Sequence, residues 1–135
     1  SKSHQDYSLT AKDIKEFETN NGIIDGNSFV IIRTGWDLLW NYPDKYRNNL
    51  NFPYISEEAA YFLLERNIIG IGIDTLSPDR ASGDFPVHKA FLGDGKYIIE
   101  NVANSSSLPA KGCFILALPI KIKNGTEAPI RLVGL

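Results

Sequence analysis

The sequence predicts an α/β fold in a single domain that spans residues 1–135. Two observations carry this prediction: helix patterns alternate with short apolar strand patterns, and no repeat, linker or low-complexity tract interrupts them. With 135 residues, 43% of them hydrophobic and 22% charged, the chain also has the size and composition of one globular domain.

The first elements are a helix and a strand. Thr10 and Asp13 form a capping box that opens a helix, and the Asn-Asn-Gly run at residues 20–22 ends it. Residues 29–32 are a continuous apolar, mostly β-branched run, which is typical of a strand buried on both faces. Gly35 allows a sharp exit from this strand.

The middle of the chain begins with a stretch rich in Asn, Tyr and Pro, and we expect an irregular surface loop at residues 41–53. Ser56 and the two acidic residues after it predict the start of a second helix. Residues 68–73 predict another buried strand, in which Gly70 and Gly72 indicate close approach of neighbouring chain segments.

The remaining elements are a short helix and three strands. Pro86 suits the first turn of the helix, which carries His88. Pro119 inside a strand pattern indicates an edge or a bulge, and Asn124 with Gly125 is a hairpin signal. The three strands are expected at residues 97–102, 114–122 and 130–133.

Composition excludes several classes of function. A net charge of −2 and an isoelectric point near 5.6 lack the basic character of a nucleic-acid-binding domain. No apolar run approaches the roughly 18 residues of a membrane span. The single cysteine and the polar first twenty residues favour a reducing compartment, and we expect the cytoplasm.

The strongest chemical signal is the pair formed by His88 and Glu100. A helix, a glycine turn and a returning strand can bring these side chains together. A carboxylate after the apolar strand residues costs several kcal/mol to bury unless a charge compensates it, and a divalent metal would do so. In the alternative, Glu100 marks the solvent end of the strand and His88 lies on the helix surface.

Two further side chains are candidates for chemistry. Asp74 follows a predicted strand, where α/β folds place functional groups, although it could equally cap the turn at residues 75–79. Ser77 could form a hydrolase triad with His88 and an aspartate. The chain has no Gly-x-Ser-x-Gly elbow, which argues against that triad.

The two tryptophans, Trp36 and Trp40, lie four residues apart and would share one face of a helix. They could line an aromatic substrate pocket or pack in the core. Arg33 could clamp a carboxylate or simply pair with Asp37, and Cys113 is expected to be a buried, inert thiol.

The order of several motifs resembles the cyclase family of hydrolases, which includes bacterial kynurenine formamidase and isatin hydrolase. The resemblance runs from about Tyr7 to the last residue. It is carried by Arg-Thr-Gly-Trp-Asp at residues 33–37, Gly-Ile-Asp-Thr at 72–75 with Ser77 and Asp79, His88, Glu100-Asn101, Ala-Leu-Pro-Ile-Lys-Ile at 117–122 and Ala-Pro-Ile-Arg at 128–131.

The resemblance implies a swivelling β/β/α fold and a metal-dependent hydrolase. Such an enzyme uses zinc or manganese to activate a water against an amide-type bond, in an aryl formamide, a lactam or a related cyclic amide. It implies His88 and Glu100 as metal ligands. Separately from the resemblance, we expect Trp36 or Trp40 to face an aromatic small-molecule substrate. We also expect a homodimer or a higher homo-oligomer.

One part of the family pattern is absent from the sequence. The upstream His-x-Gly-Thr-His-x-Asp-x-Pro-x-His stretch, which supplies further metal ligands, does not occur, and His4 has none of its neighbours. We therefore expect the C-terminal part of the family fold, with exposed core surface, and no catalytic base is assigned. The alternative is an inactive remnant or a binding module that keeps the fold; the lack of methionine modestly favours the fragment.

Overall fold

A computed structural model of the chain shows three small sheets and four α-helices within the residues that it describes, 5–135. The expectation about His4 lies outside that range. The helices are α1 (Ala11–Asn21), α2 (Pro43–Arg47), α3 (Glu57–Glu65) and α4 (Pro86–Gly93). The strands are β1 (Ser8–Leu9), β2 (Phe29–Ile32), β3 (Tyr54–Ile55), β4 (Gly70–Ile73), β5 (Tyr97–Ile99), β6 (Ile115–Pro119) and β7 (Ile130–Gly134).

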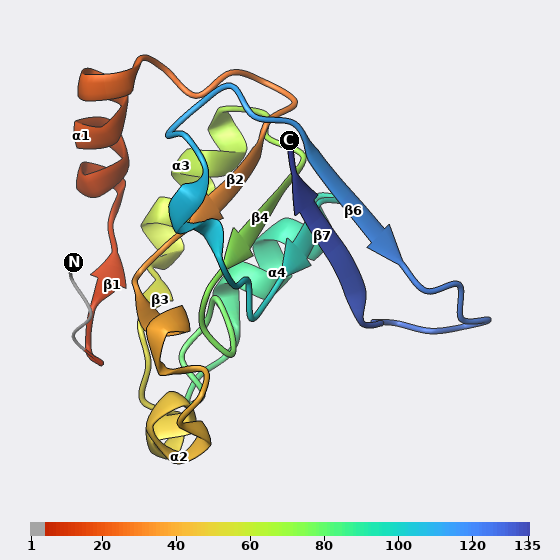
Figure 1. The fold of residues 1–135 in the computed structure, drawn as a ribbon. Helices are drawn as coiled ribbons and strands as arrows, with labels where there is room; N and C mark the ends of the chain where they lie inside the picture. The colour runs from red at the N-terminus through yellow and green to blue at the C-terminus, as the bar shows by residue number, and fades with distance from the viewer. Residues whose placement is uncertain (1–4) are drawn as a thin grey trace.

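The central sheet has the order β2-β4-β5, with all three strands parallel. Helices α3 and α4 lie together behind it in Figure 1. Ile71 and Ile73 of β4 pack with Leu63 and Phe91 of these helices, and all four side chains are fully buried. This α/β arrangement confirms the fold class that the alternating pattern predicted.

Gly70 and Gly72 lie on the other face of β4, as the two-residue period of a strand requires. A β-carbon on Gly70 would lie 2.5 Å from the Tyr97 carbonyl oxygen, and one on Gly72 would lie 3.1 Å from the Phe29 ring. The rings of Phe29 and Tyr97 stack at 5.3 Å across the three strands. The predicted close approach at these glycines is confirmed.

Local signals placed the helix starts correctly. Thr10 and Asp13 form the expected capping box before α1, and Ser56 caps α3 by accepting a hydrogen bond from Ala59 N. Strand β2 differs from the prediction: Phe29 to Ile31 are only half-buried, because β2 is an edge strand of this sheet.

The predicted surface loop at residues 41–53 is wrong in part. It contains α2, which begins at Pro43 and carries Asp44 in its first turn and Arg47 in its last. This helix escapes a periodicity analysis because it is five residues long and buries a single side chain, that of Tyr46. Proline at the first position and the matched end charges stabilise it locally.

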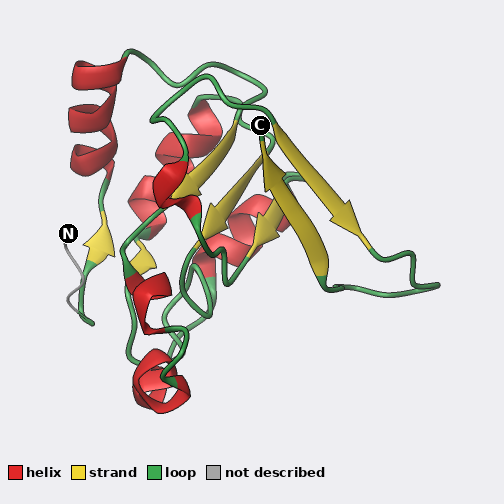
Figure 2. Ribbon diagram, in the orientation of Figure 1, coloured by secondary structure: helices red, strands yellow, loops and turns green. Residues whose placement is uncertain are grey.

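Strands β6 and β7 form an antiparallel hairpin that projects from the rest of the molecule (Figures 1 and 2). Pro119 lies at the end of β6, which is an edge strand as predicted. The connection is longer than the Asn124-Gly125 signal suggested, since residues 120–129 separate the strands. Among residues 5–135, no helix combines the length and apolarity needed to cross a membrane.

Candidate metal centre

The side chain of His88 is positioned by the first turn of α4. Phe85 adopts a left-handed conformation (φ 52°) before Pro86, and this turn brings the chain into the helix. His88 is the third residue of α4, and its backbone N–H is one of the free donors of the helix N-terminus. Its side chain is 31% exposed.

Glu100 is the first residue after β5, and Asn101 follows it in a left-handed conformation (φ 58°) that ends the strand. The Glu100 carboxylate is half-buried. Burial raises the pKa of Glu100, and the neighbouring charges of Glu127 and Asp79 raise it further, while His88 and a hydrogen bond from Ser77 lower it.

The structure brings the two predicted side chains together. The Nε2 atom of His88 lies 3.5 Å from Oε1 of Glu100, although twelve residues separate them in the sequence. This confirms the proximity expected from the helix, turn and strand. It does not test whether either side chain binds a metal, and that role stays a prediction.

Asp79 completes this cluster from the loop between β4 and α4. Its side chain is 1% exposed and accepts hydrogen bonds from the backbone N–H groups of Val87 (2.9 Å) and His88 (3.0 Å). Its Oδ2 also lies 2.7 Å from Nδ1 of His88. Sequence reasoning gave Asp79 no role, although an aspartate upstream of an uncapped, proline-started helix was a usable signal.

The donor set fits a divalent cation of the zinc or manganese class, since imidazole nitrogen and carboxylate oxygen are ligands of both. The clustered acidic groups around a single histidine favour a cation electrostatically. The set is incomplete, because no group of three His, Cys, Asp or Glu side chains that could hold a metal occurs within residues 5–135.

Asp74 acts as a clamp between the ends of β2 and β4. It is fully buried and accepts hydrogen bonds from Gly35 N (2.8 Å), Trp36 N (3.0 Å), and both the N–H (3.0 Å) and hydroxyl (2.9 Å) groups of Thr34. Gly35 has a φ of 89°, as its predicted sharp exit requires. Asp74 therefore holds the turn at residues 34–36, whereas the sequence left open a functional group at the strand end or a cap for residues 75–79.

The two tryptophans do not share a face. Residues 36–39 form a 3-10 helix, in which side chains four apart diverge. Trp36 is 4% exposed and donates its indole N–H to the Tyr46 carbonyl oxygen, whereas Trp40 is 53% exposed. Contact of either ring with a substrate stays a prediction, and only Trp40 presents a ring to solvent.

The other candidate residues have simple environments. Ser77 accepts a hydrogen bond from Asp79 N, while the Nδ1 atom of His88 is turned to Asp79 and its Nε2 atom to Glu100, so the contacts within residues 5–135 do not form a serine triad. Arg33 lies 3.8 Å from Asp37 as the pairing alternative proposed. Cys113 is half-buried rather than fully buried.

A groove of about 440 Å³ lies between α1 and the end of β2, lined among others by Phe17, Ile32 and Arg33. Neither His88 nor Glu100 lines it. The candidate metal ligands therefore lie outside this groove, after the end of β5 and in the first turn of α4.

Comparison with known proteins identifies relatives of this chain. The family described as "Putative cyclase" matches residues 1–80. The isatin hydrolase of Roseibium aggregatum is 33% identical over 96% of this chain and 53% of its own length. The kynurenine formamidase of Polaromonas naphthalenivorans is 32% identical over 62% of this chain and 37% of its own length.

Solved structures agree with the sequence relatives. Isatin hydrolase A from Ralstonia solanacearum is 30% identical and matches 96% of this chain and 53% of its own chain, with a TM-score of 0.88. A predicted metal-dependent hydrolase from Bacillus stearothermophilus is 28% identical and matches 94% of this chain and 56% of its own, with a TM-score of 0.76. The expected family fold is confirmed.

The chain spans about half the length of the isatin hydrolases that it matches. The two relatives named above are hydrolases, and the structural match extends over nearly all of this chain's residues. This chain belongs to the cyclase family.

Proposed function

We propose that this chain carries part of the active site of a metal-dependent hydrolase that cleaves an amide-type carbon–nitrogen bond. The substrate class is an aryl formamide, a lactam or a related cyclic amide, in line with the relatives' names. His88 and Glu100 would hold a divalent cation, zinc or manganese, which supplies Lewis-acid chemistry when bound. Of the tryptophans, the exposed Trp40 is the one available to an aromatic substrate.

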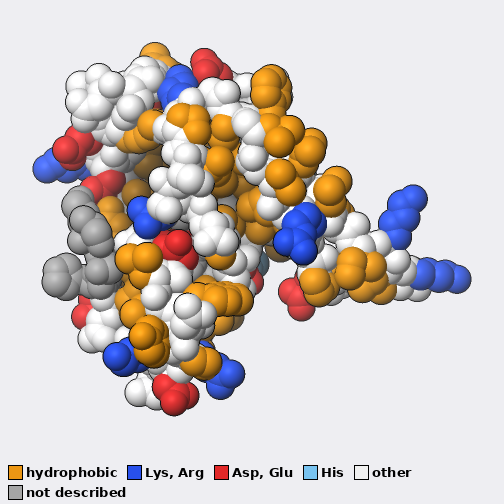
Figure 3. Space-filling model, viewed as in Figure 1, with side chains coloured by type: hydrophobic (Ala, Val, Ile, Leu, Met, Phe, Trp, Pro, Cys, Tyr) orange, Lys and Arg blue, Asp and Glu red, His pale blue; other side chains and the backbone are white. Residues whose placement is uncertain are grey.

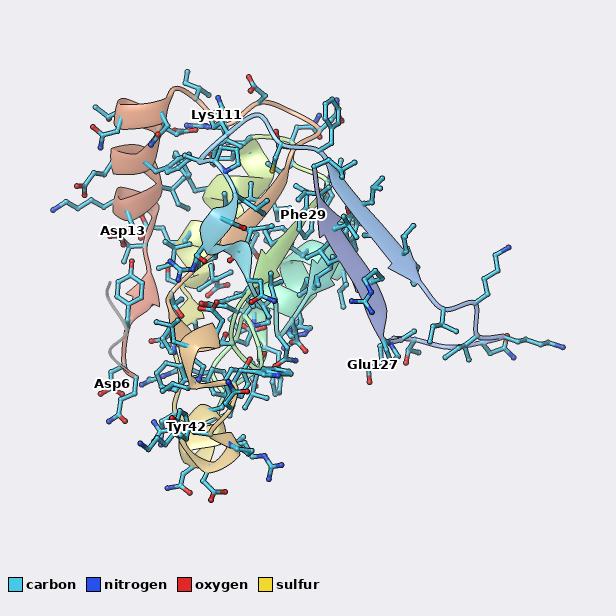
Figure 4. The ribbon with its side chains drawn as sticks, viewed as in Figure 1. Asp6, Asp13, Phe29, Tyr42, Lys111 and Glu127 are labelled. Carbon is cyan, nitrogen blue, oxygen red and sulfur yellow. The ribbon has the colours of Figure 1, made fainter. Side chains whose placement is uncertain are left out.

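One observation carries this proposal: Nε2 of His88 and Oε1 of Glu100 face each other at 3.5 Å. An unprotonated imidazole nitrogen and a carboxylate oxygen both present lone pairs, so a cation between or beside them relieves their repulsion. The acidic side chains of Glu127 and Asp79 act on the same carboxylate. Figure 4 shows Glu127 where the hairpin turns back into β7.

The test is Mn²⁺ and Zn²⁺ binding by isothermal titration calorimetry, followed by hydrolysis assays with isatin and an aryl formamide. We expect binding that is lost in His88→Ala and in Glu100→Ala. Glu57→Ala is the matched control, because Glu57 is an exposed glutamate in the first turn of α3. Binding that is equal in all four proteins would contradict the proposal.

The alternative is a binding module, or an inactive remnant, that keeps the fold without a complete metal site. Residues 5–135 bring together two candidate ligands, and this favours the alternative because catalytic zinc sites usually have three protein ligands. Metal binding without hydrolysis of either substrate would support the module. Hydrolysis that requires Glu100 would support the enzyme.

We also place the protein in the cytoplasm, because its single cysteine cannot form an internal disulfide and fits a reducing compartment. Fractionation of the source cells with an antibody against the chain tests this placement. Recovery in an extracellular or membrane fraction would contradict it.

A further inference from the structure

Asp79 is the most buried acidic group beside His88, and its contacts exceed what a helix cap needs. Its Oδ1 accepts from Val87 N and its Oδ2 from His88 N, which satisfies two free donors of α4. The third contact, 2.7 Å from Oδ2 to Nδ1 of His88, is the shortest of the three and reaches the ring rather than the backbone.

This third contact determines which ring nitrogen carries the proton. An ionised carboxylate only accepts hydrogen bonds, so the nitrogen that faces Asp79 must be the donor. In a neutral imidazole, the other nitrogen then has a free lone pair. That nitrogen is Nε2, which faces Glu100 at 3.5 Å.

We propose that Asp79 is a positioning residue that holds neutral His88 as the Nδ1–H tautomer, with the Nε2 lone pair directed at the cation site. The purpose of this arrangement rests on the proposed function, because a metal-binding histidine needs an oriented, unprotonated nitrogen. The tautomer itself does not depend on any metal, and it can be measured on the chain alone.

The first experiment is ¹⁵N NMR of the histidine rings at about pH 9, above the range in which imidazoles titrate. The chain has two histidines, so His88→Gln assigns the signals directly. We expect Nδ1 of His88 to be protonated and Nε2 to be unprotonated. A protonated Nε2 at that pH would overturn the proposal.

The second experiment uses Asp79→Asn, in which one acceptor oxygen replaces two while the size of the side chain is kept. We expect a smaller fraction of the Nδ1–H tautomer and Mn²⁺ binding weaker by about 10- to 100-fold. Asp13→Asn is the matched control, since Asp13 is a capping acid of α1 and not of α4. It should leave both the His88 spectrum and the affinity unchanged.

The outcomes separate positioning from a merely structural role. An Asp79→Asn protein that loses stability but keeps the tautomer and the metal affinity would show a helix cap only, and would overturn the proposal. If this variant does not fold, the tautomer of His88 measured by NMR in the wild-type chain still tests the proposal. A wild-type chain with the Nδ1–H tautomer but no Mn²⁺ or Zn²⁺ binding would remove the proposed function while the role of Asp79 stands.

Discussion

The central sheet with its helices and the β6–β7 hairpin are built from equally apolar strands, yet they differ in burial. Ile71 and Ile73 of β4 are fully buried under α3 and α4. On β6 and the residues beside it, large apolar side chains are 45% to 78% exposed, namely Phe114, Leu116, Leu118, Ile120 and Ile122. Figure 3 shows hydrophobic side chains gathered along this side of the molecule.

An apolar pattern therefore predicts a strand, but it does not predict which element covers the apolar face of that strand. The five exposed residues alternate along the chain, so they share one face of the β6 segment. In the central sheet, the layer formed by α3 and α4 covers the apolar face of β4. The hairpin face has no such cover within the described residues.

The largest predicted effect on stability is in the core between the central sheet and its helices. Phe91→Ala removes a fully buried ring from the core, and we expect the free energy of unfolding to fall by about 3–5 kcal/mol in urea titrations. Phe114→Ala is the matched control, because its ring is 78% exposed, and we expect a change within about 0.5 kcal/mol. Equal losses of unfolding free energy in the two variants would contradict the difference in burial between the core and the hairpin.

The next effect tests the close approach of strands. Gly70→Ala places a β-carbon against the Tyr97 carbonyl oxygen in the central strand, and we expect a loss of about 1–3 kcal/mol in thermal or urea unfolding. Gly93→Ala has open space within 4 Å at the end of α4 and should raise stability by up to about 1 kcal/mol. A neutral Gly70→Ala would contradict the packing of β4 against β5.

A smaller effect depends on pH. Hydrogen bonds from Arg66 (2.7 and 2.9 Å) lower the pKa of Glu18 to about 2, against the opposing effect of burial. Because the folded state favours the charged carboxylate, this pair stabilises the protein above about pH 4.5 and is lost as the pH falls towards 2. The stability gap between wild type and Glu18→Gln should therefore close over this range, and a constant gap would contradict the assignment.

Substitutions on the exposed face of the hairpin should change the free energy of unfolding least. The informative measurement there is self-association of the chain. Residues 114–135 hold three cationic side chains and one anionic side chain, whereas the other 113 residues carry a net charge of −4. This complementarity leads us to predict that a second copy of the chain binds the apolar hairpin face.

Leu118→Glu should weaken this association in sedimentation velocity while leaving the free energy of unfolding nearly unchanged. Tyr61→Glu, on the exposed face of α3, is the control for an added charge at a residue of similar exposure. A wild-type chain that stays monomeric at about 100 μM would contradict the predicted homo-oligomer.

Short-range chemistry explains what could be predicted from the sequence. The capping box at Thr10, the cap at Ser56, the proline start of α4 and the glycines of β4 act within a few residues or through the absence of a β-carbon, so their residue types reveal them. The proximity of His88 and Glu100 belongs to the same class, because one helix, one turn and one strand link them.

Long-range contacts decided the rest. Asp74 reaches across about 40 residues to hold the turn at Thr34, and Asp79 reaches the ring of His88 only because the loop folds back over the start of α4. Trp36 and Trp40 differ in burial although both contact Tyr46, Trp36 through a hydrogen bond to its carbonyl oxygen and Trp40 through an edge-on contact of the rings at 5.2 Å. Local sequence signals thus determined most of the helices and strands and the candidate ligand pair. The tertiary structure alone decided which carboxylate orients the histidine and which apolar face stays uncovered, because both depend on segments distant in sequence.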